Sequence, residues 1–453
     1  MRCALKPVYL ACALIFLGAA AQGEQISLTP QQLVITAGRA LAARMPDAAL
    51  DMAQALLQRD PNDVQALLIK ARALRDMGQF DDASKAAKSA WSLAQSAPEK
   101  FGAAMVMAQI SSSDGRRTVA QVWLRRATQH ATTDRQRAQA RRDFQYVRAR
   151  NPWSLKLSFG AAPSSNINGG TNTDTITLFG LPFELSPDAQ ALSGYQVNAS
   201  VDLSYRIAGN GQSETRAGLQ AYAHANRLSP TAIALAPDAR GADYNYASAA
   251  ATLVHTRAAQ IPGRKLTYSL NIGRNWYAGS PLSDFASTQA QLGMGLGGAS
   301  HLTVRARADA QRNIAPGAGT LFLGALSGDL LRPTDSGAAF RLSFGAQKSF
   351  SSDATQQYTQ AQVGLDYFFA KPILGTNLSM GISASQKDYA ASYYTTNGRH
   401  DFQLSAHVEM RFGQVQYYGF SPVVTVKTAQ TTSNVALYST DSTSIALGFR
   451  SNF

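Results

Sequence analysis

The hydrophobic pattern of the chain changes near Asn151-Pro152. Residues 30–150 are rich in alanine, and their apolar positions recur as they do along amphipathic helices. Residues 151–453 are rich in Gly, Ser, Thr, Asn and Tyr, and apolar and polar side chains alternate there with a period of two. The pattern therefore predicts a helical part followed by a β-rich part.

An internal repeat runs through the helical part. Small or aromatic residues occupy the packing positions of a helix-turn-helix unit of about 34 residues, so the pattern resembles a tetratricopeptide repeat. The middle unit supplies Ala71, Gly78, Phe80, Ala83 and Ala90. Small side chains let two helices approach closely, and stacked pairs of helices then bury one continuous core. We expect three such repeats, capped by a helix over 134–150; an unrelated helical bundle is the alternative.

Long alternating runs dominate the β-rich part, and the clearest covers residues 195–207. Its apolar positions form one face and its polar positions the other. A transmembrane barrel places the apolar face outside and the polar face inside, whereas a soluble sandwich alternates over shorter strands. Comparable runs occur near 153–161, 215–226, 244–256, 264–276, 286–297, 300–311, 338–350, 356–369, 376–387, 400–412, 415–427 and 442–453. Their length favours an antiparallel outer-membrane β-barrel.

The strand count needs one more strand, because thirteen runs are visible and single-chain bacterial barrels have an even number. We take the helical domain and the C-terminal end both to lie in the periplasm, and assign successive connections alternately to the outside and to the periplasm, starting from each end of the barrel. The two assignments disagree within 312–337. We therefore expect a fourteenth strand there, around 319–326. Loop length and parity place 161–192 and 388–399 outside the cell, and 208–214 and 413–414 in the periplasm.

The N-terminal residues indicate a secretory signal peptide over 1–21. Basic residues precede a short apolar stretch over 8–18, and the sequence Ala19-Ala20-Ala21 follows it. The apolar stretch is too short to form a membrane helix. Cleavage after Ala21 would leave a periplasmic helical domain over 22–150 and a barrel over 151–453. Both cysteines, Cys3 and Cys12, would be removed, so the exported chain would hold no thiol. A lipid-anchored Cys12 is the alternative.

The composition and the net charge of the chain indicate which classes of partner it can meet. The net charge is +13, only 16% of residues are charged, and past residue 21 no apolar run reaches membrane-helix length. An exported basic protein meets lipid headgroups, anionic glycolipid or an acidic partner rather than nucleic acid. Arginines cluster over 116–150, either as solvated helix faces or as a surface against the anionic inner leaflet.

The sequence offers no pattern for catalysis or cofactor binding. Gly293-x-Gly295-x-x-Gly298 matches the dinucleotide fingerprint by its letters, but a strand rather than a helix should follow it. Gly293, Gly295 and Gly297 instead share the inward parity of the run 286–297 and leave a bare patch of barrel wall. The histidines are scattered, and neither H-E-x-x-H nor G-x-S-x-G occurs. We expect a protein that is not an enzyme, with no cofactor and no metal.

Several short motifs lie along the chain: Trp153-Ser154-Leu155, Ser164-Ser165-Asn166-Ile167-Asn168, Arg399-His400-Asp401, Gly419-Phe420-Ser421-Pro422, Ser433-Asn434-Val435-Ala436-Leu437-Tyr438 and Phe453. With them the chain resembles the surface lipoprotein assembly modifier family. The resemblance implies a periplasmic tetratricopeptide domain before a fourteen-stranded outer-membrane barrel that helps deliver lipoproteins, or related soluble proteins, to the outside. It implies a client lipoprotein or secreted protein, outer-membrane lipids and the barrel-assembly machinery as partners. The run 164–171 also has the composition of a polar turn, and Pro422 predicts a strand start or bend.

Two sets of residues are candidates for function. The groove-lining face of the first helix in the middle repeat holds Gln65, Leu68, Arg72 and Arg75, which are candidates for binding an extended client. The apolar face of the last run holds Ile445, Leu447, Phe449 and Phe453, and the resemblance implies that assembly machinery recognises this end. We expect a translocation component that captures a client and passes it through the barrel. The alternative is an exopolysaccharide exporter or a diffusion porin.

Overall fold

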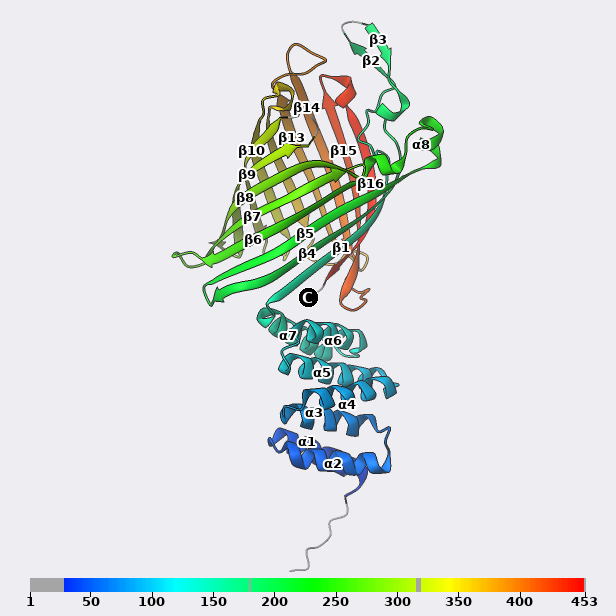
Figure 1. Cartoon of the computed structure of the whole chain (residues 1–453), viewed down its shortest axis with the longest axis vertical. Helices are drawn as coiled ribbons and strands as arrows, with labels where there is room; N and C mark the ends of the chain where they lie inside the picture. Colours follow the sequence, from blue (N-terminus) through cyan, green and yellow to red (C-terminus); the bar gives the residue numbers. More distant parts are fainter. Residues whose placement is uncertain (1–27, 179–180, 315–318, 452–453) are drawn as a thin grey trace, which may run out of the picture. The chain divides into compact units, whose positions relative to one another are not determined.

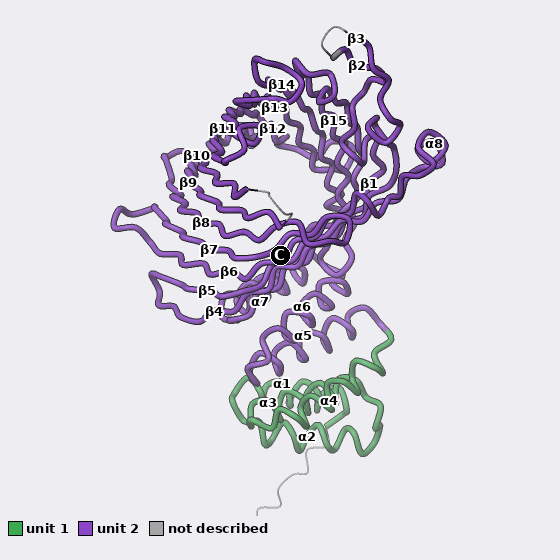
Figure 2. Tube along the Cα trace, turned by 45° about the horizontal axis from the view of Figure 1, so that its top comes forward, with its two compact units in different colours: residues 1–95 green, residues 96–453 purple. Residues whose placement is uncertain are grey.

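The computed structural model describes residues 28–178, 181–314 and 319–451. The chain divides into two compact units, residues 1–95 and residues 96–453 (Figure 2). The change from helix to strand falls between Arg150 and Trp153, where the hydrophobic pattern changes. Three helices therefore belong to the same compact unit as the strands. The signal peptide predicted over 1–21 lies outside the described residues.

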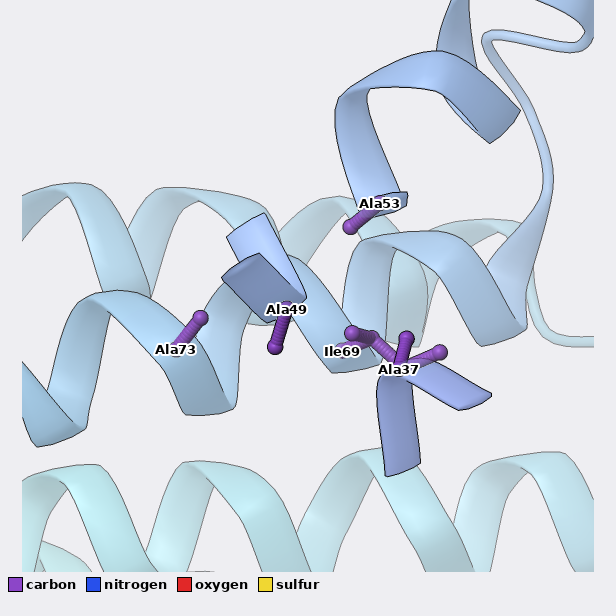
Figure 3. Close-up of a cluster of buried hydrophobic side chains, with 5 residues drawn as sticks. All are labelled: Ala37, Ala49, Ala53, Ile69 and Ala73. Carbon is purple, nitrogen blue, oxygen red and sulfur yellow. The ribbon is translucent and has the colours of Figure 1, made fainter. Parts of the chain in front are cut away.

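The described part of the first unit contains four helices. They are α1 (Pro30–Ala42), α2 (Pro46–Arg59), α3 (Val64–Asp76) and α4 (Phe80–Leu93). Thr29 begins α1 with a capping box, because its hydroxyl accepts from the Gln32 amide and the Gln32 side chain accepts from the Thr29 amide. A cluster of small side chains packs between the helices: Ala37, Ala49, Ala53, Ile69 and Ala73 (Figure 3). Alanine at these positions lets the helices approach closely, as the repeat pattern predicts.

Three further helices precede the strands in the second unit. They are α5 (Ala97–Ser113), α6 (Arg117–His130) and α7 (Asp134–Arg150). Helix α7 occupies the range expected for the capping helix and buries Phe144 and Val147. Together with α1–α4, these helices form the tetratricopeptide-like N-terminal region that the sequence predicts. No described helix is both long enough and apolar enough to span a bilayer.

Fourteen antiparallel strands of the described chain close into a barrel (Figure 1). Each strand pairs with its neighbours in sequence, and β1 pairs with both β4 and β16. The strands are β1 (Trp153–Ser164), β4 (Gly194–Asn210), β5 (Ser213–Leu228), β6 (Tyr246–Ala258), β7 (Arg264–Tyr277), β8 (Ser280–Gly297), β9 (Ser300–Asn313), β10 (Thr320–Pro333), β11 (Ala339–Phe350), β12 (Tyr358–Phe368), β13 (Asn377–Tyr389), β14 (Arg399–Arg411), β15 (Phe420–Ser433) and β16 (Thr440–Ser451). Strand β10 is the fourteenth strand expected within 312–337. The predicted fold class is confirmed.

The barrel wall has an apolar outer surface and a polar inner surface. Large apolar side chains point outward and are exposed, including Ile207, Ile272, Leu326 and Ile382. On β4, β7 and β13 the alternate positions hold mostly polar or small side chains, which face inward, whereas β10 also places Leu321, Leu323 and Leu331 on the inner wall. A soluble sandwich would bury its apolar face, whereas this surface needs lipid around it. The barrel is therefore of the outer-membrane type.

Two strand boundaries differ from those that the sequence predicts. Strand β15 begins at Phe420 rather than near residue 415, because Tyr418 and Gly419 adopt positive φ angles of 49° and 74° and form part of a longer turn. Pro422 lies at the third residue of β15, close to the strand start that proline predicts. Strand β8 begins at Ser280, earlier than residue 286, and runs to Gly297 before β9. No helix follows Gly293, so the dinucleotide interpretation fails as expected.

The segment between β1 and β4 has structure of its own. It contains the hairpin β2 (Thr175–Leu178) and β3 (Leu181–Glu184), which the alternating pattern does not reveal. The segment between β5 and β6 contains a short helix, α8 (Pro230–Leu235). Both connections lie at the end of the barrel that is opposite the N-terminus of β1, because the strands alternate in direction.

Candidate functional site

The lumen wall brings oppositely charged side chains together. Inward positions that are close on one strand or on nearby strands place each carboxylate beside a cation. The ion pairs are Lys156–Asp202, Arg305–Asp329, Arg307–Asp309, Arg341–Asp366, Arg399–Asp401 and Arg450–Glu409. Between them the wall presents hydroxyl and amide groups. Lys265, Lys387 and Lys427 also face the lumen and have no ion-pair partner among the described residues, so the wall keeps some excess of positive charge.

A cavity of about 440 Å³ lies on the inner wall from β4 to β9. Its lining includes Asp202, Gln220, Tyr222, Asn271 and Arg307. The Gln220 amide donates towards Asp202, and the Asn271 amide donates to the Ser287 hydroxyl at 3.0 Å. The lining combines neutral hydrogen-bonding groups, the charged Asp202 and Arg307, and the two aromatic rings of Tyr222 and Phe285, a surface that suits an extended polymer of polypeptide or sugar.

A second polar cluster lies on the inner wall of β11 to β14. The Arg341 Nε donates to Asp366 Oδ2 at 2.9 Å, and His407 Nε2 lies 3.3 Å from Asp366 Oδ1. Gly381 lies beneath them, and a Cβ there would come within 2.3 Å of Asp366 Oδ1. Asp366 is only 8% exposed. Glycine at 381 therefore makes room for this buried carboxylate and its two partners.

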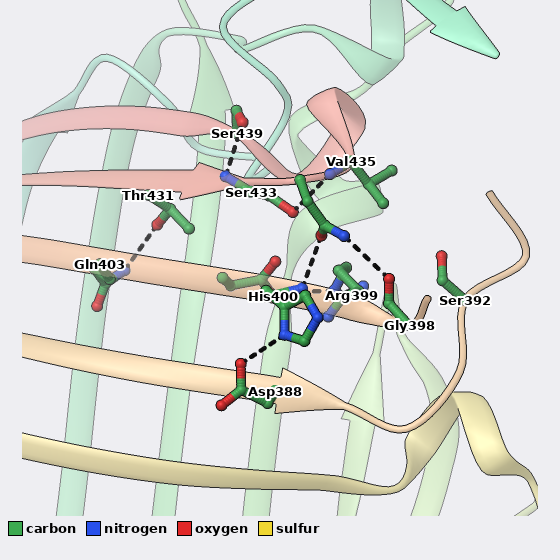
Figure 4. A network of polar contacts seen from close by, with 12 residues as sticks. Asp388, Ser392, Gly398, Arg399, His400, Gln403, Thr431, Ser433, Val435 and Ser439 are labelled. Atoms are coloured by element: carbon green, nitrogen blue, oxygen red, sulfur yellow. Dashed lines mark hydrogen bonds and ion pairs between the residues drawn. The ribbon is translucent and has the colours of Figure 1, made fainter. Parts of the chain in front are cut away.

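The motif Arg399-His400-Asp401 organises one end of the barrel (Figure 4). The Arg399 guanidinium lies between the rings of Tyr389 and Tyr438, 3.6 and 3.7 Å from their centroids, and pairs with Asp401. The His400 amide donates to Asn434 Oδ1 at 2.7 Å, and the Asn434 amide group donates to the Gly398 carbonyl. These contacts join the β13–β14 and β15–β16 loops, so the motif has a structural role here.

The run 164–171 likewise makes structural contacts. The Asn166 and Asn168 amides donate to the carbonyls of Gly170 and Gln190, at 2.8 and 2.7 Å. The Thr171 hydroxyl is almost fully buried and donates to the carbonyls of Ala436 and Ser439. The polar side chains hold the first loop of the barrel to the last one, in agreement with the turn interpretation of this run.

The candidate client-binding residues share one face of α3. Gln65 is exposed, while Leu68, Arg72 and Arg75 are half-buried. Arg75 pairs with Asp76 at 2.6 Å. Burial, with the neighbouring Arg75 guanidinium second, lowers the pKa of Arg72 from its usual value. The structure brings the four residues together on one helix, and their binding of a client remains a prediction.

Sequence reasoning missed the role of Arg125 in α6. Its guanidinium donates to the Tyr418 carbonyl at 3.3 Å and to the Ser451 hydroxyl at 3.1 Å, and it lies over the rings of Phe144 and Phe420. Burial, with Arg148 second, lowers the pKa of Arg125 to about 10, so it stays charged at neutral pH. This arginine joins a helix to the barrel rather than to solvent or lipid. Arg125 is one of many arginines in the segment 116–150, and nothing in the local sequence distinguishes it as the one that contacts the barrel.

The residues predicted as the assembly signal lie on the outer face of β16. Ile445, Leu447 and Phe449 are exposed on the outside by 50%, 48% and 56%. Phe453 lies outside the described residues. Among the residues that the structure describes, no group of His, Cys, Asp or Glu is arranged to hold a metal ion.

Comparisons with known proteins show similar folds at low sequence identity. No family model matches the chain, and no curated protein is significantly similar to it. The type III secretion translocator chaperone SycD of Yersinia enterocolitica is 18% identical, with 28% of this chain and 97% of SycD covered and a TM-score of 0.25. A BenF-like porin of Pseudomonas fluorescens Pf-5 is 10% identical over 66% of this chain and 98% of the porin, with a TM-score of 0.36. A bacterial polysaccharide outer membrane secretin is 8% identical over 65% and 98%, with a TM-score of 0.34.

The fold and the lumen define the class of protein. A closed barrel of fourteen described strands, apolar outside and hydrogen-bonding inside, follows a tetratricopeptide-like helical region. The chain is an outer-membrane β-barrel protein with an N-terminal repeat region of this kind.

We expect the two ends of the barrel to differ in accessibility on intact cells. The connections 165–193 and 390–398 lie at one end, and the turns 211–212 and 412–419 lie at the other. A single cysteine at Asp174 should react with an impermeant maleimide, whereas one at Gln212 should react only after the outer membrane is opened. The mature chain expected from cleavage after Ala21 has no cysteine of its own, so the background is low. Labelling of intact cells at residue 212 would reverse the topology.

Proposed function

We propose that this protein is an outer-membrane translocation component that is not an enzyme. Its helical region, in the periplasm, captures a client protein, and its barrel assists the passage or surface display of that client. The client is a surface lipoprotein or a related secreted protein, as the resemblance to the surface lipoprotein assembly modifier family implies. The other partners are the outer-membrane lipids and, during insertion, the barrel-assembly machinery.

The observation that carries this proposal is that the lumen wall combines side chains of both charges with neutral hydrogen-bonding groups. A polypeptide carries neutral amides and side chains of both signs, so a wall with one strong charge would trap or repel parts of it. Here the inward carboxylates lie beside cations, and hydroxyl and amide groups fill the spaces between them. Such a wall can exchange hydrogen bonds with a moving chain at little electrostatic cost.

The half-buried face of α3 that holds the candidate residues supports the capture step. Tetratricopeptide-like repeats present a concave surface that suits an extended polypeptide. On α3 this surface combines an amide at Gln65, an apolar side chain at Leu68 and the guanidinium of Arg72. Arg72 forms no hydrogen bond or ion pair with other described residues, so its donors are available for a carboxylate or carbonyl of the client.

The test reverses the charge of this face. The Arg72→Glu variant should lower the surface exposure of the client about tenfold, because a charge-assisted hydrogen bond contributes about 1.5–3 kcal/mol. The control is Arg59→Glu, which makes the same change at an exposed position at the end of α2. The measurement is protease and antibody access, on intact cells, to the secreted or lipidated proteins encoded beside this gene. Equal client exposure in both variants would contradict the capture role.

The lumen cavity favours one second candidate, export of a neutral polysaccharide. Tyr222 offers a ring for stacking against a sugar, and Gln220 and Asn271 offer amides for its hydroxyl groups. In this case Tyr222→Ala should reduce exopolysaccharide on the cell surface and leave client proteins exposed. If polymer or small-solute flux falls while every candidate protein stays exposed, the exporter or porin function replaces the proposed one.

A further inference from the structure

The outer wall of the barrel contains a strip of small side chains between larger ones. The strip covers the outward positions of residues 286–290 on β8 and 306–310 on β9, and we call it the trough. Strands β7 to β10 lie side by side in the wall (Figure 1). Their outward register rows across the trough are Tyr268–Ala290–Ala306–Leu326, Leu270–Thr288–Ala308–Gly324 and Ile272–Ala286–Ala310–Phe322.

The trough is apolar and hollow. A cavity of about 500 Å³ on the outer wall has Tyr268, Leu270 and Ala306 in its lining. The trough extends from Ala290 to the level of Asp284, a length of about 20 Å at a rise of about 3.3 Å per residue. This surface faces the hydrocarbon of the bilayer, where the available material is lipid. The length and the lining suit an acyl chain.

A row of charged side chains lies at one end of the trough. Arg274 of β7, Asp284 of β8 and Arg312 of β9 are in register and point outward, next to the row that contains Ala286. Arg274 Nε donates to Asp284 Oδ1 at 2.7 Å, and Arg274 Nη2 donates to Oδ2 at 3.1 Å. Arg312 Nη2 lies 3.6 Å from the same carboxylate, and the Arg312 side chain is 74% exposed. Two guanidinium groups share one carboxylate, so this arginine row keeps a net positive charge.

The arginine row lies where the wall meets the headgroups. Strand β7 ends at Tyr277 and β9 ends at Asn313, so Arg274 and Arg312 are close to the ends of their strands. These ends are opposite the end at which β1 begins, because the strands alternate in direction. Loop length and parity assign this end to the outside of the cell. The headgroups at this level therefore belong to the outer leaflet.

The combination of the two features selects a ligand. The trough alone would accept an acyl chain of any lipid, and the arginine row alone would attract any anion. Together they fit a lipid that carries a phosphate close to its acyl chains. Arginine suits phosphate because its forked donors form paired, charge-assisted hydrogen bonds with the phosphate oxygens. The matching lipid of the outer leaflet is a phosphorylated glycolipid.

We propose that the trough and the arginine row bind one molecule of this phosphorylated glycolipid. One acyl chain lies in the trough, and a phosphate contacts the guanidinium groups of Arg274 and Arg312. The site follows from the outer wall and involves no client. Only the assignment to the outer leaflet rests on the proposed function, because that function places the helical region in the periplasm.

The first experiment measures which lipid the mature protein retains. The protein is purified in detergent and mixed with lipid A, with lipid A from which the phosphates have been removed, or with phosphatidylglycerol. Bound lipid is then counted by native mass spectrometry. Retention of one lipid A should exceed retention of the other two lipids at least about tenfold. Equal retention of all three lipids, or a preference for phosphatidylglycerol, would overturn the proposal.

The second experiment removes the charge of the arginine row. The double variant Arg274→Gln with Arg312→Gln should retain about tenfold less lipid A, because each cation near an anionic lipid surface adds to the attraction. The control is Arg332→Gln, which removes an exposed outward cation at the opposite end of β10. It should change retention by less than about twofold. Similar losses in the double variant and the control would argue for net charge rather than a site.

The third experiment fills the trough and leaves the charges in place. Ala308→Trp puts a large apolar side chain into the middle row, so the outer wall stays compatible with lipid and the barrel should still fold. Lipid A retention should fall at least about fivefold, and the lipid should no longer raise the Tm of the protein. The control is Ala361→Trp, the same change at an exposed outward position of β12. Undiminished retention in Ala308→Trp would overturn the placement of the acyl chain.

The outcomes for this site and for the proposed function are separable. Lipid retention is measured on the purified protein without a client, whereas the capture role is tested at Arg72 by client exposure on cells. If Arg72→Glu leaves client exposure unchanged, the capture role fails and the lipid site stands. If a cysteine at Gln212 is labelled on intact cells, the arginine row lies at the periplasmic side, and the assignment of the outer-leaflet glycolipid fails.

Discussion

Replacing Ile382 with arginine should destabilise the barrel by about 2–4 kcal/mol, because the charge would enter the hydrocarbon core of the bilayer. Ile382 lies near the middle of β13, points outward and is 61% exposed on the bare barrel. Lipid covers this side chain in the membrane. The loss of free energy should appear as less heat-modifiable protein and as a lower denaturant midpoint for unfolding from vesicles.

The matched control for this change is Ser385→Arg on the same strand. Ser385 pairs with Gln362 and Gln403 and faces the polar lumen. An arginine there keeps its hydration, so the free energy of unfolding should change by less than about 1 kcal/mol. Equal destabilisation by the two substitutions would show that the outward face is not in lipid. It would reopen the possibility of a soluble barrel.

Replacing Arg125 with alanine should loosen helices α5–α7 from the barrel by about 2–4 kcal/mol. The substitution removes charge-assisted hydrogen bonds to Tyr418 and Ser451 and a cation that lies 4.5 Å from the centre of the Phe420 ring. Hydrogen exchange should then accelerate in the 412–419 turn and at the start of β15. The strands on the far side of the barrel should be unaffected.

Two further variants test the cause of this loosening. Arg125→Lys keeps the charge but loses the forked donors, so it should recover only part of the protection. Arg142→Ala removes another cation of the same basic segment from an exposed position and should change the free energy by less than about 0.5 kcal/mol. If Arg142→Ala accelerates exchange as much as Arg125→Ala, the net charge of the helices, rather than this contact, holds them.

The fold could be predicted from local patterns to a large extent. Alternation along residues 195–207 fixed the orientation of the wall, and the parity argument placed β10 correctly although its apolar pattern is weak. The sequence predicts too early a start for β15, because Val415 and Tyr417 continue the alternation of apolar and polar residues. The positive φ angles at Tyr418 and Gly419 interrupt the extended backbone just before Phe420, in a turn whose Tyr418 amide donates to Gln129 of α6.

The candidate site was less accessible to sequence reasoning. The face of α3 follows from helical periodicity, so Gln65 and Arg72 could be placed together. The contact between Arg125 and Ser451 joins residues more than 300 positions apart in the chain, and no local pattern encodes it.

The paired charges of the lumen have an electrical consequence. A pore with one sign of fixed charge enriches counter-ions and separates them under a salt gradient. In this barrel, cations such as Arg305 and Arg450 lie beside Asp329 and Glu409, so their fields cancel over a few ångströms. Lys265, Lys387 and Lys427 face the same lumen and have no ion-pair partner among the described residues. Conducting states of the barrel should therefore pass chloride more readily than potassium, and the preference should weaken as the salt concentration rises.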